Sequence, residues 1–182
     1  MVVLQPITTK EVAYYTFVED LMSQTFPREE RRSDELQRVV TDEVDLFFNH
    51  VILHQSIPIG LMTYWDFGDF VFIEHFAISQ LCRGRGFGKE SLLELMKSIA
   101  KPIVLEVELP TDVNTQRRID FYKGSGFEVW DFTYHQPPYR DGDQSIPMLL
   151  MGSIGVDGER HFQRVQKLLY FYVYRVGDNE YS

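Results

Sequence analysis

Apolar and polar positions along this chain predict helices and strands in a mixed order. The helical period appears in 10–25, in a short segment that follows a turn at Pro27 and begins at Ser33, and in 89–101. Runs rich in β-branched and aromatic residues predict strands at 46–54, 59–65 and 70–78, the first two joined by a polar turn with Pro58. Thr8 or Thr9 is expected to cap the first helix, and Ser33 the second.

The rest of the chain continues the mixture. The pattern predicts a strand at 103–109, a short helix at 114–124, strands at 127–136 and 146–151, and a long helix at 159–176. This order indicates an α/β (α+β) fold with a mixed sheet. We expect a domain at 1–153 and a helical extension at 154–182 packed on it, because its stripe of Phe162, Tyr170, Tyr172 and Tyr174 is too apolar for a free tail.

Composition narrows the function classes. The chain has 182 residues, 44% of them hydrophobic and 25% charged, which is ordinary for one globular domain. Its net charge of −9 argues against a nucleic-acid partner and weakly favours cationic substrates such as amines. The sequence shows no apolar stretch of membrane length and no signal peptide, and the one cysteine, Cys82, cannot form an internal disulfide. We therefore expect a cytoplasmic protein without a membrane partner.

A glycine-rich loop between a predicted strand and a predicted helix is the strongest chemical signal. It reads Arg-Gly-Arg-Gly-Phe-Gly-Lys over 83–89. Free N–H groups at a helix N-terminus carry partial positive charge, and glycines let the backbone approach a phosphate closely. A P-loop does not fit, because its first Gly and its Ser/Thr would fall at Arg83 and Glu90. A Rossmann loop fits poorly, because the glycine spacing differs and a five-residue spacer precedes it.

The segment 72–96 resembles the central motif of the GNAT N-acetyltransferase superfamily, which is a strand, a spacer, [Q/R]-x-x-G-x-[G/A] and a helix. Arg83, Gly86 and Gly88 fill those positions in order. The segment 117–127 resembles the family's second motif, in which Tyr122, Gly126 and Phe127 match. A family asparagine is replaced by Thr115, with Asn114 beside it. The resemblance covers about 45–153.

The resemblance implies a GNAT fold, with a mixed, mostly antiparallel sheet flanked by helices. It also implies acetyl-CoA as co-substrate, no metal, and transfer of the acetyl group to a primary amine of a small molecule or peptide by direct attack in a ternary complex. Tyr122 would protonate the leaving thiolate. The residues implied to bind the cofactor lie on the third strand, in the glycine loop and on the later short helix: Phe76, Ala77, Ile78, Arg83, Gly84, Arg85, Gly86, Phe87, Gly88, Lys89 and Asn114.

Glu74 is the candidate general base. It lies within the strand 70–78 between apolar residues, and a carboxylate in such surroundings can have a raised pKa. His75, expected on the opposite face, is an alternative base. Glu106 and Glu108 are further candidates, although a solvated strand face is the favoured interpretation of these two. A structural role for Glu74 and a packing role for Tyr122 stay open at this point.

Other signals are weaker. Cys82 adjoins the basic loop and is interpreted as a small buried thiol. His50 and His54 have the spacing of paired metal ligands on one strand face, but without a carboxylate partner they are interpreted as packing residues. The acceptor is expected near Phe26–Arg28 and 135–144, although the latter can equally be a hairpin turn. The competing hypothesis is a CoA-binding sensor or an inactive GNAT-like module. A homodimer that forms through the C-terminal helix is compatible with both the enzyme and the binding-module hypothesis.

Overall fold

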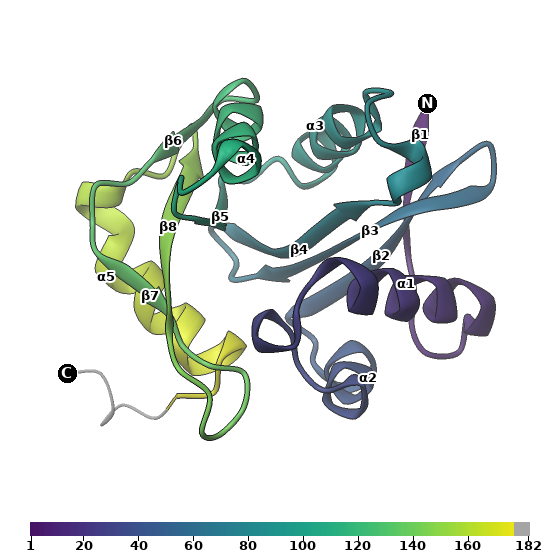
Figure 1. Cartoon of the computed structure of the whole chain (residues 1–182), viewed down its shortest axis with the longest axis horizontal. Coiled ribbons are helices and arrows are strands. Elements are labelled where there is room, and N and C mark those ends of the chain that lie inside the picture. Colours follow the sequence, from purple (N-terminus) through teal and green to yellow (C-terminus); the bar gives the residue numbers. More distant parts are fainter. Residues whose placement is uncertain (177–182) are drawn as a thin grey trace. The chain divides into compact units, whose positions relative to one another are not determined.

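Two compact units make up the part of the chain that the computed structural model describes, residues 1–176. The first unit comprises Met1–Ile103, and the second begins at Val104. Within each unit the strand pairs are antiparallel, and helices cover the strands (Figure 1). The predicted mixed α/β fold with a mostly antiparallel sheet flanked by helices is confirmed.

The first unit is built on four antiparallel strands in the order β1 (Val2–Pro6), β2 (Phe47–His54), β3 (Ile57–Asp66) and β4 (Val71–Ile78). Our sequence reading missed β1, which is short and ends at a proline. The β2–β3 turn is tighter than predicted: Gln55 and Ser56 have φ of 51° and 64°, and Pro58 lies in β3. Positive φ at both central residues suits the twist of a two-residue hairpin.

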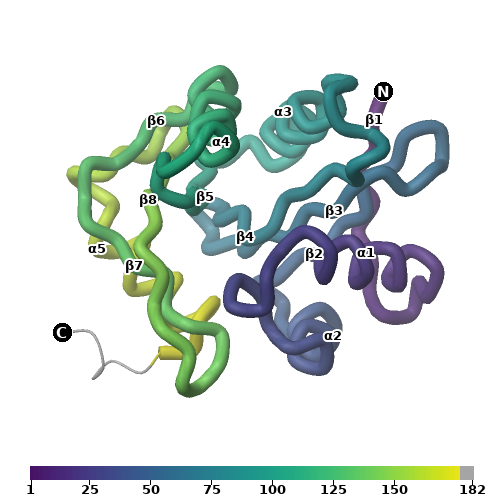
Figure 2. Tube along the Cα trace, in the orientation of Figure 1, coloured from purple at the N-terminus to yellow at the C-terminus, as the bar shows by residue number. Residues whose placement is uncertain are grey.

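Helices cover both faces of these four strands (Figures 1 and 2). Helices α1 (Val12–Thr25) and α2 (Asp34–Glu43), joined by the short turn η1 (Arg28–Glu30), cover one face, called here the α1 face. Helix α3 (Phe87–Ile99), preceded by η2 (Gln80–Cys82), covers the other, the α3 face. Apolar residues of α1 pack against inward-facing residues of β2, β3 and β4.

Capping follows the prediction for one of these helices and not for the other. Ser33 caps α2 and accepts a hydrogen bond from the N–H of Leu36 at 3.2 Å, as predicted. The cap residue of α1 is Glu11 and not Thr8 or Thr9. The Glu11 side chain accepts no helix N–H, and both the N–H and the hydroxyl of Thr8 donate to its carboxylate.

The second unit places β8 (Ile146–Ser153) between β5 (Ile103–Glu108) and β6 (Phe127–Val129), and β7 (Tyr134–Gln136) also pairs with β8. The single strand predicted at 127–136 is therefore wrong, because it is interrupted after Val129. The interruption turns the Trp130 ring onto Gly152 and Gly158, where an added Cβ would lie within 2.9 Å of the indole. The strand is interrupted at the residue whose large ring is buried.

Two helical segments complete the second unit. Helix α4 (Val113–Lys123) confirms the helix predicted at 114–124. Helix α5 (Gly158–Leu168) continues into a π-helical turn at Leu169–Val173, so the predicted long helix changes its winding. The Phe162 ring stacks on Phe132 at 4.6 Å, which packs this segment on its own unit. The boundary after residue 153 stays a prediction. Within residues 1–176, no helix is both long and apolar enough to cross a membrane.

Candidate functional site: a phosphate loop and its neighbouring strand

The glycine loop opens helix α3 as the sequence predicts. Gly86 is the cap residue, in the left-handed conformation with φ of 83°, and provides no side chain to the first-turn N–H groups. The first helical backbone bond runs from the N–H of Glu90 to the carbonyl of Gly86. The N–H groups before Glu90 are thus available to an external acceptor, which is the arrangement that binds phosphates at a helix N-terminus.

The loop residues are arranged around this helix end. Gly84 also has a positive φ, 75°, and a Cβ at either Gly84 or Gly86 would meet no atom within 4 Å. Arg83, Arg85 and Lys89 are exposed. The Arg83 Nε–H donates to the carbonyl of Ile78 at 2.9 Å, and the Arg85 guanidinium lies 5.1 Å from the centre of the Phe87 ring. An open backbone with three cations fits a pyrophosphate.

Strand β4 leads into this loop and carries three of the predicted cofactor residues. Phe76, Ala77 and Ile78 pair with Met62, Leu61 and Gly60 of β3. Ala77 is buried in the core beneath α1, whereas Phe76 and Ile78 are partly exposed. A Cβ at Gly60 would lie 2.5 Å from the Ala77 carbonyl oxygen, so glycine is required for this close pairing. Their contact with a cofactor stays a prediction.

A β-bulge changes the predicted orientation of the candidate bases. Thr63 pairs with His75 and Tyr64 pairs with Ile73, so Glu74 is the extra residue in β4. The bulge brings both Glu74 and His75 to the α1 face, which corrects the expectation that His75 points to the opposite face from Glu74. Alternation of faces fails here because the bulge adds one residue to the period of two.

The Glu74 carboxylate is buried and fully engaged. Its side chain is 1% exposed, Oε1 forms an ion pair with Arg32 at 2.6 Å, and Oε2 accepts a hydrogen bond from the Trp65 indole at 2.8 Å. The Arg32 guanidinium lies over the rings of Trp65 and Phe47 at 5.4 and 5.9 Å. This arrangement gives Glu74 a structural role in holding Arg32 and Trp65, and a catalytic role would have to act beside it. A proton could reach Glu74 only through its remaining lone pairs.

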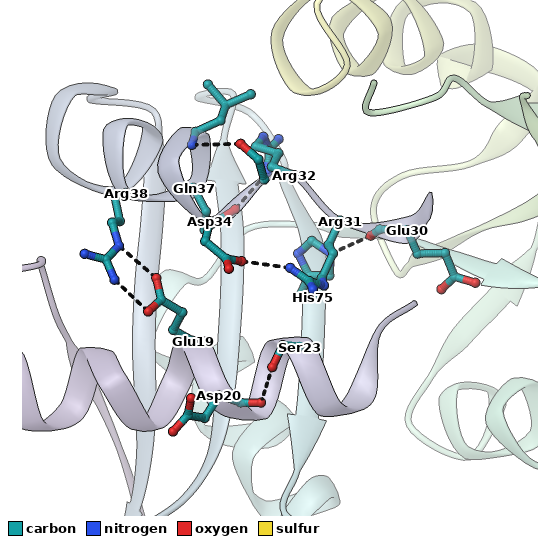
Figure 3. A network of polar contacts seen from close by, with 12 residues as sticks. Glu19, Asp20, Ser23, Glu30, Arg31, Arg32, Asp34, Gln37, Arg38 and His75 are labelled. Atoms are coloured by element: carbon teal, nitrogen blue, oxygen red, sulfur yellow. Dashed lines mark hydrogen bonds and ion pairs between the residues drawn. The ribbon is translucent and has the colours of Figure 1, made fainter. Parts of the chain in front are cut away.

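His75 ties β4 to the η1 turn (Figure 3). Its Nε2–H donates to the carbonyl of Glu30 at 2.9 Å, Thr63 Oγ1 lies 3.4 Å from Nδ1, and the Phe26 ring meets it edge-on at 4.6 Å. Burial lowers the pKa of His75, which keeps the ring neutral. Phe26, one of the predicted acceptor-site residues, is therefore held by a packing contact.

Sequence reasoning missed Arg32. It is 2% exposed, and its Nη1 also lies 3.3 Å from the Gln37 Oε1 (Figure 3). In the sequence it is one of several charged residues between two helices, and no local pattern separates a buried arginine from its exposed neighbours. Only the partner on β4, more than forty residues away, identifies it.

Tyr122, on α4 in the second unit, is 7% exposed. Its ring packs edge-on against Phe121 and Phe127, with centroids 5.1 and 5.7 Å away. Burial raises the pKa of Tyr122 to about 12, so the hydroxyl carries its proton at neutral pH. A proton donor must be protonated before the reaction, and Tyr122 meets that condition.

Asn114 lies in the first turn of α4 and is exposed. Its backbone N–H donates to Asp112 at 2.7 Å, and Asp112 and Thr115 form a reciprocal capping box. Thr115, which replaces the family's asparagine, thus stabilises the start of the helix. The cofactor contact of Asn114 stays a prediction.

The alternative carboxylates on β5, Glu106 and Glu108, both bond to other side chains of the protein. Glu106 accepts hydrogen bonds from the hydroxyls of Tyr134 and, at 2.6 Å, Tyr174. Glu108 pairs with Arg118. Near the second predicted acceptor segment, Tyr139 packs against Tyr174 at 5.0 Å, and the His135 carbonyl accepts from Tyr170 at 2.7 Å. These contacts hold the segment 135–144 to the C-terminal helical segment.

Cys82 is a partly buried free thiol at the end of η2. Within residues 1–176 no group of three His, Cys, Asp or Glu side chains is placed to hold a metal ion.

Comparison with known proteins agrees with the arrangement at α3. Residues 14–127 match the model of the Acetyltransferase (GNAT) family. Because that match spans more than half of the chain, the protein belongs to this family and is an acetyltransferase of GNAT type. The family uses acetyl-CoA as its acetyl donor.

Particular relatives support the assignment. A solved structure from Bacteroides thetaiotaomicron, titled "Putative acetyltransferase from GNAT family", is 42% identical with a TM-score of 0.93, covering 96% of this chain and 99% of its own. "Putative acetyltransferase YjbC" of Bacillus subtilis is 28% identical over 110 residues, 59% of this chain. The match spans 54% of that relative's length. An aminoglycoside 6'-N-acetyltransferase complexed with coenzyme A shares the fold at 13% identity, with a TM-score of 0.63, covering 83% and 96% of the two chains.

Proposed function

We propose that this protein transfers the acetyl group of acetyl-CoA to a primary amine of a small molecule or peptide, by direct attack in a ternary complex. The observation that carries the proposal is the Gly86-capped start of α3, with open first-turn amides and three exposed cations, in a chain of the GNAT family. Amides and cations of this kind would hold the pyrophosphate of coenzyme A.

The chemistry poses two proton problems. An alkylamine has a pKa near ~10.4 and must lose a proton before it attacks, and the leaving thiolate gains from receiving one. In this proposal Tyr122 donates the proton to the thiolate, supported by its buried, protonated hydroxyl. Glu74 removes the amine proton through a water molecule, since both of its oxygens already accept a contact from protein. Acetyl-CoA supplies the thioester.

The cofactor part is tested by thermal unfolding with and without acetyl-CoA. A ligand that binds only the folded state raises the melting temperature, and wild type should show this shift. Gly86→Val should abolish it, because valine disfavours φ of 83° and its side chain would occupy the space open to phosphate. Gly142→Val is the matched control, since Gly142 also has positive φ but lies outside the loop. Absence of a wild-type shift at millimolar acetyl-CoA would contradict the proposal.

The transfer part is tested by thiol release with polyamines, amino acids, aminoglycosides and N-terminal peptides as acceptors. Tyr122→Phe should lower kcat by about 10²–10⁴ with little change in KM, the usual contribution of a positioned acid. Glu74→Gln should act on the amine, with a defect that shrinks as pH rises. If Tyr122→Phe keeps kcat and weakens acetyl-CoA binding, the tyrosine is a cofactor contact. Binding of acetyl-CoA without transfer to any amine would support the sensor alternative.

A further inference from the structure

An ion pair adjoins the proposed acid, Tyr122, in the second unit. Glu108, at the end of β5, pairs with the guanidinium of Arg118 on α4. Arg118 and Tyr122 are four residues apart in that helix, so their side chains lie on the same face in successive turns. The ion pair and the Tyr122 side chain are therefore neighbours within one unit.

The Tyr122 ring is fixed by packing, whereas its hydroxyl is not bonded to protein. Phe121 and Phe127 hold the ring edge-on, with centroids 5.1 and 5.7 Å away. The hydroxyl makes no hydrogen bond to another residue of the described chain, 1–176. A hydroxyl that the protein does not use as a donor can donate to a ligand, and its proton can be transferred along that bond.

The ion pair places opposite charges near this hydroxyl. Burial raises the pKa of Tyr122 to about 12, the Arg118 cation opposes that rise, and the Glu108 anion adds to it. The effect of Arg118 is the larger of the two, and among the described residues these are the charged groups that act on Tyr122. The Arg118 and Glu108 side chains are 49% and 29% exposed, so water screens part of both effects.

A nearby cation matters at the step in which Tyr122 loses its proton. In the proposed transfer the C–S bond of the tetrahedral intermediate breaks and its electron pair goes to sulfur. The O–H bond of Tyr122 then breaks and an S–H bond forms, and the phenolate regains a proton from solvent, to which the amine proton was lost. Buried surroundings disfavour a phenolate, and a cation in the adjacent turn of the helix stabilises it.

We propose that Arg118, held by Glu108, is a positioning residue that stabilises the phenolate formed at Tyr122 during acetyl transfer. The inference rests on the proposed function, in which Tyr122 is the acid. Glu108 fixes the guanidinium and offsets part of its charge, so the two members of one ion pair act on Tyr122 in opposite directions. A purely structural pair has no such sign, because removing either member breaks the same bond between β5 and α4.

The first test measures the acidity of Tyr122 without cofactor or acceptor. Tyr122 is replaced by a fluorinated tyrosine, because fluorine lowers the pKa of a phenol into a range that the folded protein tolerates, and the ¹⁹F signal is followed against pH. Arg118→Met should move the titration midpoint to higher pH, because the cation is lost. Glu108→Gln should move it to lower pH, because the anion is lost. Arg118→Lys should restore most of the wild-type value.

A matched control and a kinetic readout complete the test. Arg117→Met removes the same charge from the preceding, exposed position of α4 and should leave the midpoint near that of wild type. Thiol release is then measured with acetyl-CoA and the screened amine that wild type uses fastest. Arg118→Met should lower kcat about threefold to tenfold with little change in the KM of acetyl-CoA, and Arg118→Lys should keep most of kcat.

Three outcomes would overturn the proposal. Midpoints that move in the same direction in Arg118→Met and Glu108→Gln would show a structural pair. A shift in Arg117→Met as large as that in Arg118→Met would remove the specific role of Arg118. Expected midpoints with wild-type kcat in Arg118→Met would show that the phenolate is not stabilised in the reaction. Failure of the proposed function is a separate result, seen as full kcat in Tyr122→Phe or as no transfer by wild type, and the midpoints then still show whether Arg118 acts on Tyr122.

Discussion

The two faces of the four-stranded sheet in the first unit treat a buried histidine in opposite ways. On the α1 face, His75 has a partner at each ring nitrogen, Glu30 on one side and Thr63 on the other. On the α3 face, His50 is almost as buried, yet its Nδ1 has no partner in the described chain. Burial lowers the pKa of both rings.

The difference lies in what surrounds each ring. Beside His75 lie the Arg32–Glu74 ion pair and the Trp65 indole, which bond to one another. Beside His50 is a pocket of about 410 Å³. The comparison teaches that burial alone does not determine whether the hydrogen bonds of a polar group are satisfied. The two nitrogens of His75 both have partners, whereas His50 Nδ1 is buried without one.

The largest expected effect comes from removing Arg32, which pairs with the buried Glu74 carboxylate on the α1 face. Arg32→Met should lower the free energy of unfolding by about 3–5 kcal/mol, because it leaves the buried Glu74 charge without its partner. Arg32→Met with Glu74→Gln should recover much of the loss, since Gln is neutral and still accepts the Trp65 N–H. Urea unfolding of both variants measures this. A single variant as stable as the double would contradict the ion-pair account.

The second prediction sharpens the comparison through pH. The folded pKa of His50 is about 4, below its ordinary value of 6.5, so the unfolded chain binds the proton more readily. This contribution to stability is complete above pH 6.5 and is lost as pH falls toward 4. Between pH 7 and 4.5 wild type should lose about 2–3 kcal/mol more than His50→Gln. Urea unfolding at stepped pH gives the difference, and parallel curves would refute it.

The third prediction removes one bond on the α1 face. The Thr63 hydroxyl accepts the backbone N–H of His75 at 3.1 Å and lies 3.4 Å from its Nδ1. Thr63→Val keeps the shape of the side chain and leaves these buried groups unpaired, which should cost about 1–3 kcal/mol. Unfolding in urea is the measurement. A change below about 0.5 kcal/mol would mean that a water molecule replaces the hydroxyl.

The smallest effect is expected at Tyr64, the residue that follows Thr63 in β3. Tyr64 lines the pocket on the other face, and its hydroxyl makes no hydrogen bond to another described residue. Tyr64→Phe should therefore change the free energy of unfolding by less than about 0.5 kcal/mol. Urea unfolding of Tyr64→Phe and of Thr63→Val compares the two faces of the sheet at adjacent positions of β3. A loss as large as that of Thr63→Val would erase the contrast.

Local patterns predicted most of the fold. Periodicity and capping predict α2, α3 and α4 within a few residues, and Ser33 caps α2 as predicted. The misses have local causes as well. A proline ends the short β1, and Trp130 interrupts the strand predicted at 127–136 because its ring packs on Gly152 and Gly158.

For the candidate site, the sequence predicted the phosphate loop but not the surroundings of Glu74. The order of residues in 83–89 predicted a phosphate loop, and Gly86 does cap α3 with a positive φ. The environment of Glu74 was not predictable, because Arg32 and Trp65 reach it from other elements and a bulge reorients His75. His50 was interpreted as a packing residue, and its missing partner became visible only beside the pocket.

The sequence by itself determined most of the order of elements, the glycine loop and the family to which the chain belongs, because these depend on residue spacing along the backbone. Only the tertiary structure decided which buried charged and polar side chains are paired and which are left without a partner. Ion pairs, hydrogen bonds and cavities depend on distances between residues that are far apart in sequence, so spacing carries little information about them. The contrast between His75 and His50 is of this second kind.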